Sequence, residues 1–241
     1  MRQQPWVFYG WLVVGCTLMV MALTSGTRMS FGIALVPLSE QFGWTRTTLS
    51  SIVLMAGLVT GVFQLLIGVL VDRFGPKRVL AGGVTLLGLS VWLLTMSTAV
   101  WHFLLAYGLL GGLGLAATQQ VVAAALMGNW FVQRRGLVQS VVGSAGAVGW
   151  MLVVPANMFL ERAYGWQTMY RSMSMALVLG MLPLVWALIR DRPEDIGLRP
   201  YGETTASGAT TPTASRALQG VSRREALRSS RTWNLLYLGF A

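Results

Sequence analysis

The residue best suited to chemistry in this chain is Arg28, which lies inside a long apolar stretch near the N-terminus. A guanidinium group can bind a carboxylate through two parallel hydrogen bonds, so it suits recognition of a small organic anion. Thr24 precedes it by four residues and Phe31 follows it by three, so a helix would place a hydroxyl, a cation and an aromatic ring on one face. The alternative is that Arg28 lies close to the outer headgroups, which its side chain would then reach.

Gln119 and Gln120 are a second pair of candidates, because they interrupt another apolar stretch. An amide at this place would hydrogen-bond a carboxylate or hydroxyl of a substrate, or would equally well pair with a neighbouring helix. The amides of Gln64, Gln139 and Asn157 are more typical of contacts between helices. No acidic residue lies within an apolar stretch, so this part of the chain offers no carboxylate to carry a proton.

The same inventory argues against an enzyme. The sequence shows no nucleophile paired with a base, no glycine-rich phosphate loop and no cluster of metal ligands. The single histidine, His102, adjoins Trp101, which is typical of an interfacial anchor, and the single cysteine, Cys16, lies in an apolar run. We therefore expect no metal, no cofactor and no catalysis.

Composition indicates that these residues are held in a membrane. The chain has 241 residues, of which 54% are hydrophobic and 11% charged, whereas soluble domains carry about 25% charged residues. A spanning helix needs about 20 mostly apolar residues. Six stretches meet this requirement, at residues 7–36, 49–71, 79–98, 103–127, 137–160 and 168–189.

These stretches predict three segments along the chain. Residues 1–190 form a six-span bundle, and residues 191–231 form a linker that is polar, rich in Ser, Thr and Gly, and basic at its end. Residues 232–241 begin a seventh span that is too short to cross. We expect the sequence to continue beyond Ala241, with a second bundle that completes the protein.

The positive charges predict the orientation. With the N-terminus in the cytoplasm, 14 of the 18 Lys and Arg residues lie on the inner side and three in outer loops. This bias follows the positive-inside rule, and it explains the net charge of +10 without a nucleic-acid partner. We expect a multi-pass protein of the cell (inner) membrane, with the N-terminus and the 191–231 linker in the cytoplasm.

The strongest local motif joins the second and third spans. It combines glycines for a sharp turn with an acidic residue and three cations, at Gly68, Asp72, Arg73, Gly75, Lys77 and Arg78. The pattern resembles the signature loop of the major facilitator superfamily, although Arg78 stands one place earlier than the usual last cation. The resemblance implies a conformational latch between two halves of a transporter. The alternative is a charged loop that only sets topology.

Other stretches resemble the monocarboxylate and oxalate:formate branch of that superfamily. They are the segment from Asn129 to Leu137 with the glycines after it, and the shorter segments 42–46, 164–167 and 192–200. Monocarboxylate transporters have a functional lysine in span 1, and an ungapped count places Arg28 within about one residue of it. Proton-coupled drug antiporters typically have an arginine where this chain has Tyr107, so the resemblance makes drug efflux less expected.

The resemblance implies an all-α membrane protein: a six-helix N-terminal bundle of the major facilitator fold, truncated at the start of span 7. The implied function is secondary active transport of small organic anions, chiefly monocarboxylates, by alternating access, with proton coupling left open. The alternatives are an exporter or exchanger of another solute, such as a dicarboxylate, and a six-span fragment that does not transport. The resemblance implies that a C-terminal half-bundle is needed for function.

Overall fold

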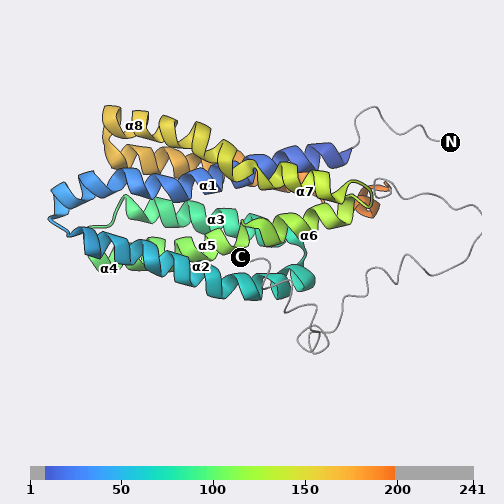
Figure 1. Ribbon diagram of the computed structural model, residues 1–241, viewed down its shortest axis with the longest axis horizontal. Helices are drawn as coiled ribbons and strands as arrows, with labels where there is room; N and C mark the ends of the chain where they lie inside the picture. The colour runs from blue at the N-terminus through green and yellow to red at the C-terminus, as the bar shows by residue number, and fades with distance from the viewer. Residues whose placement is uncertain (1–8, 199–241) are drawn as a thin grey trace, which may run out of the picture. The chain divides into compact units, whose positions relative to one another are not determined.

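A computed structural model describes residues 9–198, and within this range every regular element is a helix. The helices lie side by side with their axes roughly along one direction (Figure 1). The elements are α1 (Tyr9–Phe42), α2 (Arg46–Phe74), α3 (Pro76–Leu94), α4 (Val100–Phe103), η1 (Leu104–Gly111), α5 (Gly112–Ala117), α6 (Gln120–Trp130), α7 (Arg135–Gly143), α8 (Ala145–Met175), η2 (Ala176–Met181), α9 (Leu182–Leu188) and η3 (Pro193–Ile196).

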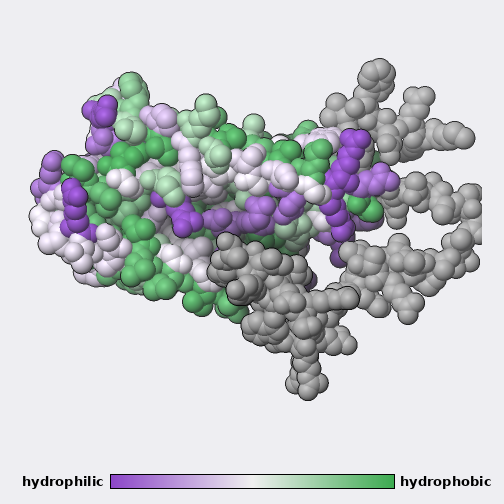
Figure 2. All heavy atoms as spheres, viewed as in Figure 1, coloured by the Kyte–Doolittle hydropathy of each residue, from purple (hydrophilic) through white to green (hydrophobic). Residues whose placement is uncertain are grey.

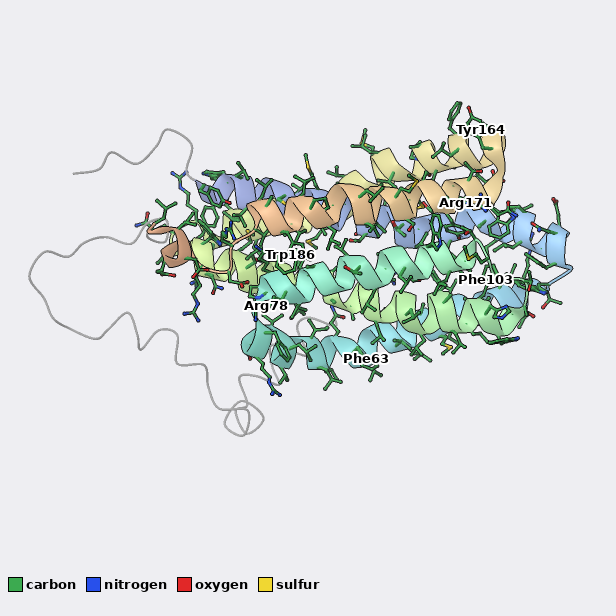
Figure 3. The ribbon with its side chains drawn as sticks, turned by 180° about the vertical axis from the view of Figure 1, so that it is seen from behind. Phe63, Arg78, Phe103, Tyr164, Arg171 and Trp186 are labelled. Carbon is green, nitrogen blue, oxygen red and sulfur yellow. The ribbon has the colours of Figure 1, made fainter. Side chains whose placement is uncertain are left out.

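Five helical stretches are long and apolar enough to cross a membrane, and the last of them covers 54 residues from Arg135 to Leu188. A helix of that length would extend about 80 Å, far beyond the hydrocarbon thickness of about 30 Å. Gly165 interrupts it with a non-helical φ of 82° and ψ of 166°. The chain reverses there, next to Tyr164 in Figure 3, so this stretch forms two crossings. We name residues 100–130 span 4, residues 135–164 span 5 and residues 166–188 span 6.

Contacts with α1 fix the direction of spans 5 and 6. Tyr9 donates a hydrogen bond to the carbonyl of Leu188, and Trp166 donates one to the side chain of Gln41, so span 6 runs antiparallel to α1 along its length. Span 5 runs parallel to α1. Its Gly149 lies against Ala22, and eight residues later Asn157 donates to Ser30, which lies eight residues after Ala22.

The two ends of the bundle differ in chemistry. At one end, which we call the aromatic end, Phe42 and Trp44 stack at 4.6 Å between ring centroids, and both contact Phe103. Trp166 packs against Phe103 and Phe42 at the same end. The other end, which we call the basic end, carries the turn between α2 and α3, the Arg134–Arg135 turn and the residues after span 6.

The six predicted spans are confirmed as helices, but some of their limits differ from the prediction. The loop expected over 72–78 is a single residue, Gly75, because α2 continues to Phe74 and α3 begins at Pro76. Gly75 has a φ of 85°, and Pro76 has its ring-fixed φ at the first helical position, so the turn needs no longer segment. The helix α1 passes Pro37 and ends at Phe42, before Gly43 with a φ of 67°. Most of the predicted linker and the predicted start of a seventh span lie outside the described residues.

Candidate functional site

Arg28 lies close to the middle of α1. The helix runs from Tyr9 to Phe42, so Arg28 is about 4 Å from its midpoint at a rise of 1.5 Å per residue. A helix ending at Val36, as predicted from the sequence, would have left Arg28 about 10 Å from the midpoint. The side chain of Arg28 is exposed on the surface of the bundle. A cation at this depth is costly in lipid unless it faces water, a cavity or a partner.

The backbone at Arg28 is held by span 4. Tyr107 donates a hydrogen bond from its hydroxyl to the carbonyl of Arg28 at 3.3 Å, and its ring stacks on Phe31 at 4.5 Å between centroids. Tyr107 belongs to η1, a π-helical segment, and is buried. Within residues 9–198 no ion pair joins the Arg28 guanidinium to a carboxylate, and all the acidic residues of that range lie near helix ends. The charge of Arg28 is thus unneutralised among the described residues.

Thr24, Arg28 and Phe31, which the sequence places on one helix face, differ in their exposure. Thr24 is 3% exposed and Phe31 is 1% exposed, whereas Arg28 is exposed. The Thr24 hydroxyl donates to the carbonyl of Met21 on its own helix. Thr24 and Arg28 differ in exposure because residues four apart on a helix are rotated by about 40° about its axis. This rotation is enough to turn one side chain into the bundle and leave the other at its surface.

Gln119 and Gln120 lie at a break in span 4 that the sequence patterns did not predict. Thr118, with a φ of −111° and ψ of 7°, ends α5, and Gln119 is extended before α6 begins at Gln120. The Thr118 hydroxyl donates back to the carbonyl of Gly114 at 3.1 Å, which favours bending at this point. Half-helices that meet near the middle of a membrane are typical of transporter binding sites.

The structure does not bring the two glutamines to Arg28. Tyr107 contacts the carbonyl of Arg28, and Gln119 lies twelve residues further along span 4, about 18 Å toward the basic end. The side-chain nitrogen of Gln120 is 3.7 Å from the position of a Cβ on Gly143 of span 5, so this amide lies between spans 4 and 5. The predicted residues therefore form two levels, with Arg28 nearer the aromatic end and the glutamines nearer the basic end.

A hydrophilic band runs across one face of the bundle. Figure 2 shows it between the layer of α1 and α7 and the layer of α2, with hydrophobic surface on either side. The spans on this face are α1, α2, span 4 and span 5 (Figure 1). Their polar residues that are at least partly exposed include Ser25, Arg28, Gln64, Gln119, Gln120, Gln139, Ser140 and Ser144.

Asn157 has a structural partner within this framework. Its amide donates to the Ser30 hydroxyl at 2.7 Å, and the Ser30 hydroxyl in turn donates to the carbonyl of Gly26. Asn157 is 3% exposed and Ser30 is fully buried. This is the contact between helices that the sequence predicted for this amide, and it joins α1 to span 5 two residues from Arg28.

The motif residues at the basic end divide into an exposed group and a docked group. Asp72 and Arg73 are exposed, Arg73 lies 5.4 Å from the ring centroid of Phe74, and no ion pair within 9–198 involves either of them. Lys77 is 7% exposed, and its ammonium donates to the carbonyl of Trp186 on span 6. Gly68 on α2 has no atom within 4 Å of the position of a Cβ, and Arg78 is exposed.

Asp191 is the residue that sequence reasoning missed. Its carboxylate accepts a hydrogen bond from the backbone N–H of Lys77 at 2.7 Å, so a negative charge lies at the N-terminus of α3. Its carbonyl accepts from the side chain of Asn129, and the neighbouring carbonyl of Arg190 accepts from the Trp130 indole. A Cβ on Gly75 would approach the Asp191 carboxylate to 2.8 Å, so glycine is needed there for space as well as for conformation. The only sequence signal was an acidic residue directly after a span.

No group of three or more His, Cys, Asp or Glu side chains within 9–198 is placed to hold a metal ion. The described surface of the bundle instead offers an unneutralised arginine at mid-depth, a hydrophilic band and a docked turn at one end.

Comparisons with known proteins point to a single family. Residues 14–241 match the model of the Major Facilitator Superfamily. The chain is 27% identical over 175 residues to the uncharacterized MFS-type transporter YcxA of Bacillus subtilis, which covers 73% of this chain and 43% of that protein. It is 25% identical over 179 residues to human monocarboxylate transporter 2, covering 73% of this chain and 35% of the transporter.

A further relative is named as an efflux protein. The fujikurins efflux protein of Gibberella fujikuroi is 22% identical over 158 residues, covering 65% of this chain and 33% of that protein. In all three comparisons the match spans less than half the length of the relative. The family match covers nearly the whole sequence and agrees with the multi-pass helical bundle. The chain belongs to the Major Facilitator Superfamily.

Proposed function

We propose that this chain is part of a secondary active transporter that moves small organic anions, chiefly monocarboxylates, across the cytoplasmic membrane by alternating access. The observation that carries the proposal is the exposed, unneutralised Arg28 near the middle of α1. A guanidinium held at this depth supplies paired donors for a carboxylate, and binding neutralises a charge that is costly in the membrane. Relatives named monocarboxylate transporters support this class of substrate.

Within this proposal the site residues act at different depths. Arg28 binds the carboxylate, and Thr24, which is buried one turn away, would contact the solute only in another transport state. Gln119 and Gln120 form a second polar level toward the basic end, at the break in span 4. A second helical bundle would close the other side of the hydrophilic band.

The basic end is proposed to face the cytoplasm, together with the N-terminus and the 191–231 linker, by the positive-inside rule. The latch would consist of Gly68, Asp72, Arg73, Gly75, Lys77 and Arg78. The exposed Asp72 and Arg73 would contact the other half in one transport state, while the docked Lys77 and Asp191 keep the turn rigid. The proposal includes coupling to protons in one of two forms. Either the substrate itself carries the proton, or the residue that carries it lies outside the described spans.

The test is uptake of radiolabelled propionate by the intact protein in proteoliposomes. We expect Arg28→Gln to abolish uptake and Arg171→Gln, which removes an exposed arginine of span 6, to leave it within about twofold of wild type. Uptake by Arg28→Gln with wild-type affinity would remove Arg28 from the site.

An exporter or exchanger is the second candidate, favoured by the relative named as an efflux protein. Counterflow separates the two. An obligate exchanger takes up labelled solute only into vesicles preloaded with a counter-substrate, whereas a symporter or uniporter also fills empty vesicles.

A further inference from the structure

An apolar groove lies between α2 and α3, over span 4, in the half of the bundle at the basic end. Its volume is about 360 Å³, and eleven of its twelve lining residues are uncharged, among them Phe63, Leu70, Phe74, Gly82 and Leu113. The exception is Arg78. Figure 3 shows Arg78 at the basic end, where α3 begins, and Phe63 further along α2. The groove is therefore apolar along its length and cationic at one end.

The depth of the groove comes from small residues in its floor. No atom lies within 4 Å of the position that a Cβ of Gly82 would occupy, so this glycine leaves open space along α3. Gly83 packs tightly, since its Cβ would lie 2.7 Å from the Cβ of Ala117 on span 4. On the α2 side the wall is formed by large side chains, with Leu70 40% and Phe74 48% exposed. The groove thus opens at the surface of a membrane-spanning bundle.

The size and lining match one lipid chain. Phe63 and Phe74 are eleven residues apart, so the groove extends about 16 Å along α2, close to the roughly 15 Å hydrocarbon depth of one leaflet. Apolar cavities do not retain water. Within the hydrocarbon region, an acyl chain is the apolar group available in quantity to fill the groove.

The positive charges at the basic end of the groove determine which lipid headgroup it favours. Arg78 is exposed, and no ion pair within the described range 9–198 involves it. Arg73 lies 5.4 Å from the ring of Phe74, which is itself part of the groove wall, so a second cation stands at the same end. Two cations beside an apolar groove that is as long as one leaflet is deep complement a negatively charged headgroup.

We infer that this groove is a binding site for an anionic phospholipid, with one acyl chain along Phe63, Leu70 and Gly82 and the phosphate at Arg78. The site is separate from the hydrophilic band and does not depend on which solute the protein moves. It belongs to the leaflet on the side of the basic end.

The test uses the intact protein in nanodiscs of equal parts phosphatidylglycerol and phosphatidylcholine, with retained lipid counted by native mass spectrometry. Wild type should keep one phosphatidylglycerol in preference to phosphatidylcholine. We expect Arg78→Gln to lower that preference about fivefold and Gly82→Leu, which fills the groove, to reduce retention of both lipids. Matched controls are Arg192→Gln, another exposed arginine, and Gly180→Leu, another open glycine, and neither should change retention.

Several outcomes would overturn the inference. Equal losses in Arg78→Gln and Arg192→Gln would mean that diffuse surface charge attracts the lipid. Unchanged retention in Gly82→Leu would mean that no chain occupies the groove. Absence of any retained lipid in wild type would mean that protein covers it, either residues beyond 198 or another bundle. Arg78→Gln leaves the groove wall intact, so it tests the headgroup contact even where Gly82→Leu fails to fold.

Discussion

The carboxylate of Asp191 accepts a hydrogen bond from the backbone N–H of Lys77 at 2.7 Å, although 114 residues separate the two in sequence. The contact places the exit of span 6 against the first turn of α3. It also adjoins Gly75, the single residue between α2 and α3. The signature turn of this chain is therefore fixed from one side by its own bundle, while Asp72 and Arg73 stay exposed.

Asp191→Ala should lower the stability of the intact protein. The substitution leaves an N–H of the first turn of α3 without its acceptor and removes a favourable charge at a helix N-terminus, at a cost of about 1 kcal/mol. Thermal unfolding in detergent measures the change. Glu194→Ala is the control, because Glu194 is exposed three residues away. An equal effect of the two substitutions would show that the contact contributes nothing specific.

Ser30 and Asn157 should be energetically coupled. Their hydrogen bond of 2.7 Å joins α1 to span 5 in a buried position, and such bonds between membrane helices contribute about 0.6 kcal/mol on average. A double-mutant cycle of Ser30→Ala and Asn157→Ala, measured from unfolding in mixed micelles, gives the coupling energy. Strictly additive effects would contradict the assigned bond.

Gly149→Ala should disrupt the contact between α1 and span 5. A Cβ at this position would clash with the backbone of Ala22, which cannot move aside as a flexible side chain can. We expect a loss of roughly 1–3 kcal/mol, as for other overpacked positions. Gly146→Ala in the same helix is the control, because its nearest atom, the Ser25 hydroxyl, would be 3.8 Å away. Unfolding temperatures that fall equally in both variants would argue against this tight approach.

The sequence predicted the helices better than it predicted the site. Spans are set by local hydropathy, and the turn at Gly165 falls within segment 164–167, which the sequence marked by its resemblance to the monocarboxylate branch. The break at Thr118 was not, because it depends on a hydroxyl bonding back to Gly114 within a run that is otherwise helical in pattern. The opposite burial of Thr24 and Arg28 was also hidden, since it depends on how the other spans pack around α1.

Asp191 illustrates the same limit at the basic end. Its role depends on Lys77 and Asn129, which reach it only after span 6 has returned alongside α3 and span 4. A sequence motif can mark the acidic residue but cannot name a partner more than 100 residues away.

The most direct test of the central claim compares a carboxylate with its uncharged amide. Titration calorimetry of the intact protein with propionate and propionamide gives the preference for the charge, and Arg28→Gln gives the share of that preference due to the guanidinium. A hydrogen bond to a charged group contributes about 1.5–3 kcal/mol, so the variant should lose about 10- to 100-fold of the preference for propionate. Arg171→Gln should keep it. If Arg28→Gln distinguished propionate from propionamide as well as wild type does, Arg28 would not be the anion-binding residue.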